Sequence, residues 1–397
     1  MVQENMTGII ESWNNQQSFQ TGPVTEDKLS PVTYGRIRTL YGHTWREEKL
    51  SPNFDWGAQQ FSVYLPESLY VVSSVYLKID LPANASGNYK DYPALYAMKT
   101  LRLMSNGNEV YTVEPELFFH EYLESLSEES LRVFSDAYLG KEANASGGAR
   151  SIMVPILLPN SQYLGRTGDN KGHGIFPFFL GTGRLELQIT MNPATHVAAD
   201  VNNPPASIAG ACTLMYHQVE MSEVKTKVYA DLRGKYSIIN RRFTELTSGW
   251  TEYASANAVA TCSQYQPQGC VTELMIVAVN ENADESRHGR TYILPTSIKI
   301  TADSIVQRHL DTPQKVKAEL WQNGFVPPVD FPSPGRLCFA AHASRSDHVY
   351  SGAYNMANHS NVVIEFTFAT TVRYKVIAAQ IQRVTIDAEG AIRSSLQ

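Results

Sequence analysis

Residues 100–140, TLRLMSNGNEVYTVEPELFFHEYLESLSEESLRVFSDAYLG, combine two kinds of pattern in one stretch. Leu101 and Leu103 alternate with other residues, which is the period of a strand with one buried face. A polar turn and a second short strand follow, and the chain then reaches Pro115. The segment after this proline predicts a helix, because apolar residues recur at helical spacing at Phe119, Tyr122, Leu123 and Leu126.

A second stretch with the same order lies about half a chain length later, at residues 297–324, SIKITADSIVQRHLDTPQKVKAELWQNG. Ile298 and Ile300 alternate in a predicted strand, and a polar turn and a second strand lead to Pro313. Val316 and Leu320 then supply the apolar stripe of a predicted helix. A strand-turn-strand-helix unit that recurs once per half chain predicts two similarly built domains in tandem.

The composition favours β-structure and argues against direct nucleic-acid binding. Of 397 residues, 43% are hydrophobic and only 18% are charged, and Tyr (21) outnumbers Phe (15). The net charge of −6 provides no basic surface that could follow a nucleic-acid backbone. Four cysteines are too few for a disulfide framework and fit a reducing cytosol; Cys262 and Cys270 are expected to be free thiols, with a small disulfide-closed loop as the alternative.

The N-terminal residues 1–20 predict a short amphipathic helix with an apolar stripe at Val2, Met6, Ile9, Ile10 and Trp13. We consider two roles for it: an inner-face anchor that lies on a membrane or a neighbouring subunit, or a helix packed under its own domain. The absence of Lys and Arg before Lys28 argues against tight binding to anionic lipid. Without a signal-peptide pattern or a run of about 18 apolar residues, a soluble protein is expected.

Alternating strand patterns recur along the rest of the chain, with few helical patterns between them. They lie at residues 60–65, 71–81, 151–159, 184–191, 212–221, 274–279, 361–368 and 374–386. Many short strands and few helices predict an all-β protein of two tandem, antiparallel, eight-stranded jelly rolls, each with a short helix in a loop. The predicted division is residues 1–54 for the helix and an extended arm, 55–195 and 211–390 for the jelly rolls, 196–210 for a linker and 391–397 for a tail.

No motif in the sequence predicts a reactive site. The glycine-rich residues 168–174 lack the Gly-Lys-Ser/Thr ending of a phosphate-binding loop. The spacing of His342, His348 and His359 matches no zinc-ligand pair. A catalytic carboxylate pair is defined by its distance in space, which sequence does not reveal. Glu128, Glu129 and Glu186 therefore stay formal candidates, without any positive signal. We therefore predict no catalytic, cofactor-binding or metal-binding residue, and a protein whose surface is its function.

Residues 325–368 carry a likeness to a known family. A turn at Pro332, Ser333, Pro334 and Gly335 is followed by an apolar strand, by Ser344-Arg345 and by the strand NVVIEFTF. This order resembles the second-domain ending of the double jelly-roll major capsid proteins of adenovirus, membrane-containing phages and large nucleocytoplasmic DNA viruses. The likeness extends over residues 60–386, and it departs from the pattern where Pro334 separates Ser333 from Gly335.

The resemblance implies a homotrimer with a near-hexagonal outline that tiles an icosahedral virion shell. Expected partners are neighbouring capsomers, minor capsid or vertex proteins and, as an open option, an internal membrane, with assembly in the host cytoplasm. The helices after Pro115 and Pro313 would pack against neighbouring sandwiches, the loops at 82–93, 142–150 and 280–290 would face outward, and the termini would face inward. Two alternatives stay open: a double-sandwich hydrolase of glycans or glycoproteins, and a receptor-binding or minor vertex protein.

Overall fold

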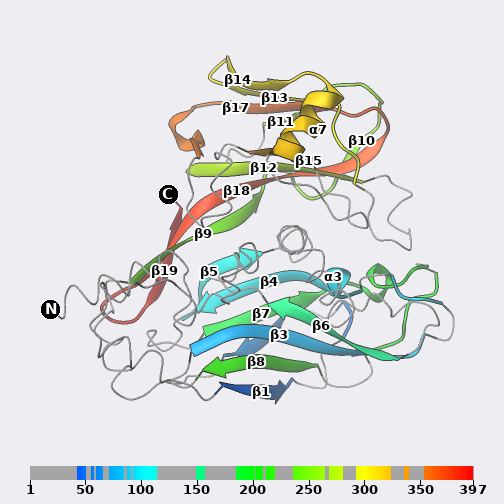
Figure 1. The fold of residues 1–397 in the computed structure, drawn as a ribbon, viewed down its shortest axis with the longest axis vertical. Helices are drawn as coiled ribbons and strands as arrows, with labels where there is room; N and C mark the ends of the chain where they lie inside the picture. The colour runs from blue at the N-terminus through cyan, green and yellow to red at the C-terminus, as the bar shows by residue number, and fades with distance from the viewer. Residues whose placement is uncertain are drawn as a thin grey trace. The chain divides into compact units, whose positions relative to one another are not determined.

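In the computed structural model the chain forms two compact units (Figure 1). The first comprises residues 1–240 and 383–395, and the second comprises 241–382 and 396–397. The structure describes residues 43–50, 55–57, 60–65, 71–84, 87–90, 93–113, 149–156, 185–200, 202–208, 212–219, 236–263, 268–279, 292–322, 335–338 and 353–396. The predicted N-terminal helix and the predicted helix after Pro115 lie outside these residues.

The first unit contains two four-stranded antiparallel sheets, with the orders β1-β8-β3-β6 and β2-β7-β4-β5. Alternation explains the strands: in β7 the residues Leu185, Leu187 and Ile189 are buried, while those between them are partly exposed. The bounds are β1 (His43–Lys49), β2 (Phe61–Tyr64), β3 (Val71–Leu81), β4 (Met98–Ser105), β5 (Asn108–Val113), β6 (Arg150–Ile156), β7 (Leu185–Met191) and β8 (Thr213–Val219).

The second unit repeats this topology. Its sheets contain the orders β10-β18-β12-β15 and β11-β17-β13-β14. The bounds are β10 (Thr251–Tyr253), β11 (Ala260–Cys262), β12 (Cys270–Val279), β13 (Ser297–Ala302), β14 (Ile305–Leu310), β15 (Gly335–Cys338), β17 (Val362–Thr367) and β18 (Val372–Ile386). When the eight strands of each sandwich are counted from its own first strand, both have the orders 1-8-3-6 and 2-7-4-5. The predicted double jelly roll is confirmed.

Within the described ranges, three further strands and four short helical segments supplement the two sandwiches. The strands β9 (Tyr236–Glu245) and β19 (Ile392–Leu396) pair with β18, and β16 (Tyr354–Asn355) pairs with β12. The helical segments are α3 (Pro93–Ala97), η4 (Ala194–His196), α7 (Pro313–Gln322) and η6 (Met356–Asn358). Helix α7 confirms the helix predicted after Pro313, whereas α3 was not expected in the segment before β4.

The repeated hairpins β4–β5 and β13–β14 match in detail. Each turns through two residues with positive φ, Asn106 (49°) and Gly107 (81°) in the first and Asp303 (48°) and Ser304 (68°) in the second. These values are typical of the two-residue turns that fit the twist of a hairpin. Each hairpin also carries a register shift near its tip. The half-chain repeat read from the sequence is therefore a repeat of the fourth and fifth jelly-roll strands.

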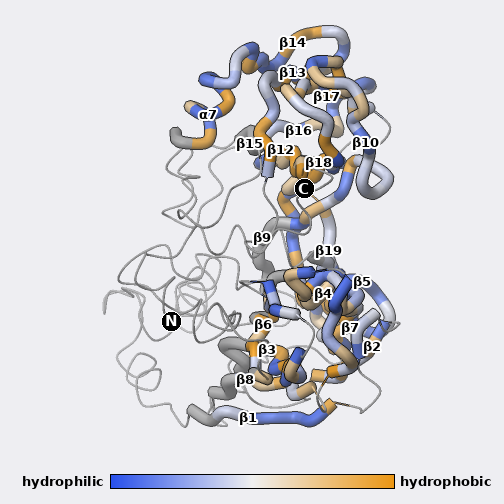
Figure 2. The backbone as a smooth tube through the Cα atoms, turned by 90° about the vertical axis from the view of Figure 1, so that its right-hand side faces the viewer, coloured by the Kyte–Doolittle hydropathy of each residue, from blue (hydrophilic) through white to orange (hydrophobic). Residues whose placement is uncertain are grey.

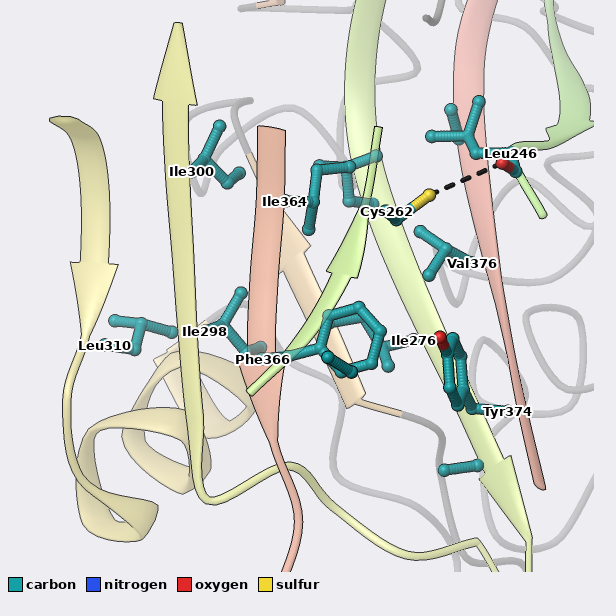
Figure 3. Packing of buried hydrophobic residues seen from close by; sticks show 14 of the residues in the cluster. Leu246, Cys262, Ile276, Ile298, Ile300, Leu310, Ile364, Phe366, Tyr374 and Val376 are labelled. Carbon is teal, nitrogen blue, oxygen red and sulfur yellow. Dashed lines mark hydrogen bonds between the residues drawn. The ribbon is translucent and has the colours of Figure 1, made fainter. Parts of the chain in front are cut away.

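The core of the second sandwich lies between its two sheets (Figure 3). Phe366 is at its centre, with ring centroids 4.9 Å from Tyr374 and 5.6 Å from Phe368. Cys262 lies in the same core and donates a hydrogen bond to the Leu246 carbonyl at 3.4 Å. Colouring by hydropathy shows the contrast between a central strand such as β12, largely hydrophobic, and the edge strand β1, largely hydrophilic (Figure 2).

The segment predicted to be a linker packs onto the first unit where it is described. Ala198 forms an isolated bridge with Tyr89, and the Ile208 N–H donates to Asp55 Oδ1 at 3.0 Å. Tyr89 belongs to the loop at 82–93, which was predicted to face outward. Its side chain is instead fully buried, and its hydroxyl donates to the Pro82 carbonyl at 2.5 Å. The described parts of these two segments therefore pack against each other.

The strand β8 was expected to open the second jelly roll, but it pairs with β1 and β3 of the first unit. The reason is topological: the eighth strand of a jelly roll returns to lie between the first and the third. The strand β1 was likewise expected in an extended arm, and it pairs with β8 along its whole length. In the structure the strands of the first sandwich span residues 43–219.

Candidate assembly surfaces

One broad surface lies on the outward side of the sheet β1-β8-β3-β6. In β3 the core side is occupied by Val75, Leu77 and Ile79, so the alternating Tyr76 and Lys78 point away from the core. Met215 of β8 is opposite Tyr76 and shares its side of the sheet. We call the outward surface formed by Trp45, Lys49, Tyr76, Lys78, Met153 and Met215 the open face.

An exposed aromatic residue stands at the edge of the open face. Trp45 of β1 is 49% exposed, and its ring centroid lies 5.9 Å from that of Tyr76. Tyr76, Lys78, Met153 and Met215 are each partly exposed. An indole that remains half in water exposes apolar area without the burial that would stabilise the fold.

On the equivalent sheet of the second sandwich, the outward side is buried along β12 and part of β18, whereas Glu252 of the edge strand β10 is exposed. On β12 and β18 the residues that face the core are Leu274, Ile276 and Val376, and those between them face the other way. These outward residues are nonetheless buried: Met275, Val277, Ile377 and Ala379 are each at most 1% exposed. Strand β12 is therefore buried on both of its sides, which explains its nearly continuous apolar sequence.

Helix α7 is amphipathic in the way that the sequence predicted. Val316 is fully buried in the core of the second sandwich, and Leu320 is 7% exposed and packs against Leu294. Lys315 and Lys317 lie on the exposed side, and Lys315 Nζ is 2.7 Å from Asp311 Oδ1. The apolar stripe of α7 is therefore buried within its own unit, and the exposed side of the helix carries Lys315 and Lys317.

An ion pair joins α7 to the second hairpin. Arg308 Nη2 is 2.5 Å from Glu319 Oε1, with the Glu319 side chain only 7% exposed. Arg308 stands opposite Ile300, a core residue, so its side chain begins on the core side of β14. At this edge of the sandwich the ion pair between Arg308 and Glu319 stands where an apolar contact would be expected on the core side of a strand.

A polar network fixes the tip of the same hairpin. Asp303 Oδ1 accepts hydrogen bonds from Ser360 N (2.9 Å), Ser360 Oγ (2.7 Å) and Asn361 N (3.2 Å), and Oδ2 lies 2.8 Å from His359 Nδ1. His359 Nε2 in turn lies 2.8 Å from the Tyr354 hydroxyl. The Ser360 hydroxyl and then the His359 ring lower the pKa of Asp303 to about 2. The network joins the hairpin tip to the segment before β17.

Metal-ligand groups and cysteine thiols can be assessed among the described residues. Among them no group of three His, Cys, Asp or Glu side chains is arranged to hold a metal ion. Burial raises the pKa of the Cys212 thiol to about 12 and that of Cys262 to about 11, so neither is a ready nucleophile. Cys262 and Cys270 are both free, as the sequence indicated. Glu186 accepts a hydrogen bond from Gln188 on its own strand at 3.2 Å.

Several residues singled out in the sequence fall outside the described part of the chain. They are the N-terminal stripe Val2, Met6, Ile9, Ile10 and Trp13, the helix positions Phe119, Tyr122, Leu123 and Leu126, and the residues Glu128, Glu129, His342 and His348. His359, by contrast, is described and belongs to the Asp303 network. Within the described part, no helix combines the length and apolarity needed to cross a membrane.

Comparisons with known proteins identify the fold. No protein-family model and no curated protein matches this sequence. Solved structures do match over nearly the whole chain. PBCV-1 VP54, fitted into a reconstruction of the virophage Sputnik, aligns with a TM-score of 0.66 at 11% identity, over 90% of this chain and 97% of its own. The Faustovirus major capsid protein aligns with a TM-score of 0.61 at 10% identity, over 97% and 98% of the two chains. The mavirus major capsid protein aligns with 0.57 at 12% identity, over 89% and 90%.

Proposed function

We propose that this chain is the major capsid protein of an icosahedral DNA virus and assembles as a homotrimer. The proposal is supported chiefly by the alignment of both sandwiches with capsid proteins of several viruses. The alignments cover about nine tenths or more of this chain and of each capsid protein. Two sandwiches of one topology in a chain, taken three times, give the six similar units that a hexagonal outline needs. The protein acts in this proposal through its surfaces and not through catalysis.

The surfaces support the proposal in several ways. The half-exposed Trp45 and the exposed lysines of α7 are features that suit a subunit that meets neighbours. In the shell, neighbouring capsomers and minor capsid or vertex proteins are the partners, and the virion is the location. The N-terminal stripe with Met6, Ile9, Ile10 and Trp13 serves as the inner-face anchor, and assembly takes place in the host cytoplasm.

The mass of the purified protein in solution tests the proposal. Three chains of 44.2 kDa give 3 × 44.2 = 132.6 kDa, and we expect this species at low micromolar concentration. Electron micrographs should show particles with a near-hexagonal outline. A protein that stays at the mass of one chain at this concentration would contradict the proposal, because a capsomer must persist as a unit before it joins a shell.

The N-terminal segment allows a separate test of its role. Deletion of residues 1–20 should leave the trimer intact and impair shell formation, which electron microscopy of assembly reactions can measure. If the truncated protein fails to fold or to form trimers, the segment is part of the core of its own domain, and the anchor role is wrong.

A further inference from the structure

The tips of the two repeated hairpins carry different residues in the same turn. The first tip reads Asn106-Gly107 and the second reads Asp303-Ser304, with φ of 49° and 48° at the first position. Asparagine is chemically labile when glycine follows it, because the next main-chain nitrogen can attack the side-chain carbonyl carbon and no Cβ stands beside that nitrogen. The same dipeptide recurs in the sequence at Asn323-Gly324, outside the described residues.

We propose that Asn106 is a site of spontaneous covalent modification, at which attack by the Gly107 nitrogen converts the asparagine to aspartate and isoaspartate. A bond forms between the Gly107 nitrogen and Asn106 Cγ, the bond from Cγ to the side-chain nitrogen breaks, and ammonia leaves with the proton of the Gly107 amide. Water then opens the cyclic imide at Cγ, which gives aspartate, or at the main-chain carbonyl carbon, which gives isoaspartate. The reaction needs only water, and it does not depend on the proposed function as a capsid protein.

The amide nitrogen of Gly107 is available for this attack. Among the described residues, the Gly107 N–H donates to no carbonyl, and the Asn106 side chain has no hydrogen-bond partner. Both residues are exposed, and a Cβ added at Gly107 would meet no atom within 4 Å. The turn is closed by the pair of Ser105 and Asn108 close to a register shift, so the rotation that brings the nitrogen to Cγ breaks few interactions.

Other exposed asparagines of the described ranges are followed by an amide that is already engaged. Asn257 also has a positive φ, 60°, but the N–H of Ala258 after it donates to the Ser255 carbonyl at 3.2 Å. The next N–H likewise donates to a main-chain carbonyl at three further exposed asparagines: Asn202, Asn355 and Asn358. An engaged amide must lose its acceptor before it can attack, and this loss adds to the barrier. Asn257 is therefore an internal control for Asn106.

The two products differ in their effect on the hairpin. Asp303 has the same φ as Asn106 in the equivalent turn, so an aspartate at position 106 fits the turn as it stands. Isoaspartate carries the main chain through Cγ and lengthens a turn whose ends are fixed by the pairing of Ser105 with Asn108. We expect aspartate to leave the hairpin intact and isoaspartate to disturb its tip. Both products add a negative charge to an exposed surface.

Incubation of the full chain in water enriched in heavy oxygen tests the proposal. Modification during the incubation places heavy oxygen in the new carboxylate, whereas earlier modification does not, and mass spectrometry of peptides distinguishes the two. We expect the label at Asn106 and on the order of tenfold less at Asn257. Isoaspartyl methyltransferase should transfer a methyl group to the peptide that contains position 106. Equal labelling of Asn106 and Asn257 would overturn the proposal.

A variant and an unfolded reference separate the role of the turn from that of the sequence. Gly107→Ala keeps the asparagine and has space for its Cβ, and we expect it to be labelled on the order of tenfold more slowly. Labelling of this variant at the wild-type rate would contradict the Gly107 nitrogen as the nucleophile. We expect the folded chain to react within about tenfold of the rate in guanidinium chloride. If Asn106 stays intact in the folded chain while the unfolded chain converts it, the turn protects the site and the proposal is wrong.

Discussion

Tyr111 in the first sandwich and Arg308 in the second occupy the same place in the repeated hairpin, and they close their cores by different means. Each stands opposite a core residue, Leu103 or Ile300, next to the register shift of its hairpin. Tyr111 is 1% exposed, whereas Arg308 reaches Glu319 on α7. The two halves therefore share their strand topology but differ in the side-chain contact at the edge of the core, which is a buried tyrosine in one and an ion pair in the other.

The largest effect on stability that we predict from this comparison comes from removing the Arg308–Glu319 ion pair of the second sandwich. Arg308→Met removes the cation beside the buried Glu319 carboxylate. Removing one partner of a buried ion pair costs about 3–5 kcal/mol, and because Arg308 is 36% exposed we expect a loss of roughly 2 kcal/mol in the free energy of unfolding. Urea titration followed by intrinsic fluorescence measures it.

The first hairpin offers a matched control for this variant. Arg102 and Glu109 also form an ion pair across the hairpin, at 4.0 Å, but their side chains are 47% and 34% exposed. An exposed pair contributes only about 0–1 kcal/mol, so Arg102→Met should change stability little. Equal losses in Arg308→Met and Arg102→Met would mean that the two hairpins do not differ in the way described.

The second prediction concerns the turns. Asp303 and Asn106 occupy the same turn position, and Asp303→Asn makes the second turn chemically like the first. The pKa of Asp303 is about 2 in the folded protein, below the ordinary value of 3.8. A lowered carboxyl pKa contributes stability above the unfolded-state value, and this contribution is lost as the pH falls through the folded-state value.

Thermal unfolding of Asp303→Asn across pH provides the measurement. Near neutral pH the variant should melt at a lower temperature than the wild-type protein, since an amide is uncharged and its NH2 group cannot accept a hydrogen bond from His359 as Oδ2 can. The amide oxygen can still accept from Ser360 and Asn361. The two melting temperatures should converge as the pH approaches 2. A difference that is constant over the whole range would show that the charge of Asp303 does not matter.

The smallest effects are expected at the next turn position. Gly107 has φ 81° and no atom within 4 Å of an added Cβ, so Gly107→Ala introduces only backbone strain, about 1 kcal/mol. Ser304 already bears a side chain at φ 68°, and Ser304→Gly should relieve strain and stabilise by about 0.5 kcal/mol after the entropic cost of glycine. Chemical denaturation of both variants checks the opposite signs.

The sequence predicted those parts of the fold in which local pattern and burial coincide. Alternation located β3 and β7, and the proline with its apolar stripe located α7. It did not reveal β1, because HTWREEK is an edge strand whose side chains at 45–49 are all exposed and leave no alternation to detect. It also misplaced β8, since strand pairing between distant segments leaves no local mark.

The assembly surfaces were predicted less well, for a physical reason. The stripe at Val316 and Leu320 was correctly read as apolar, but sequence does not tell whether such a stripe faces its own core or a neighbour. The open face had no signal at all, because Trp45, Tyr76 and Met215 come from three strands and gather only when those strands pair.

The position of the eighth strand has a consequence for synthesis on the ribosome. His43 pairs with Val219, and Thr251 pairs with Tyr374, so each sandwich is completed only by its last strand. Until residue 219 has been translated, β1 has no partner and β3 exposes an unpaired edge, which is a hazard for aggregation. We therefore expect the arrival of the returning strand to limit the rate of folding, once for each half of the chain. A ribosome that stalls between residues 81 and 213 would release a chain whose first sandwich is open at its centre.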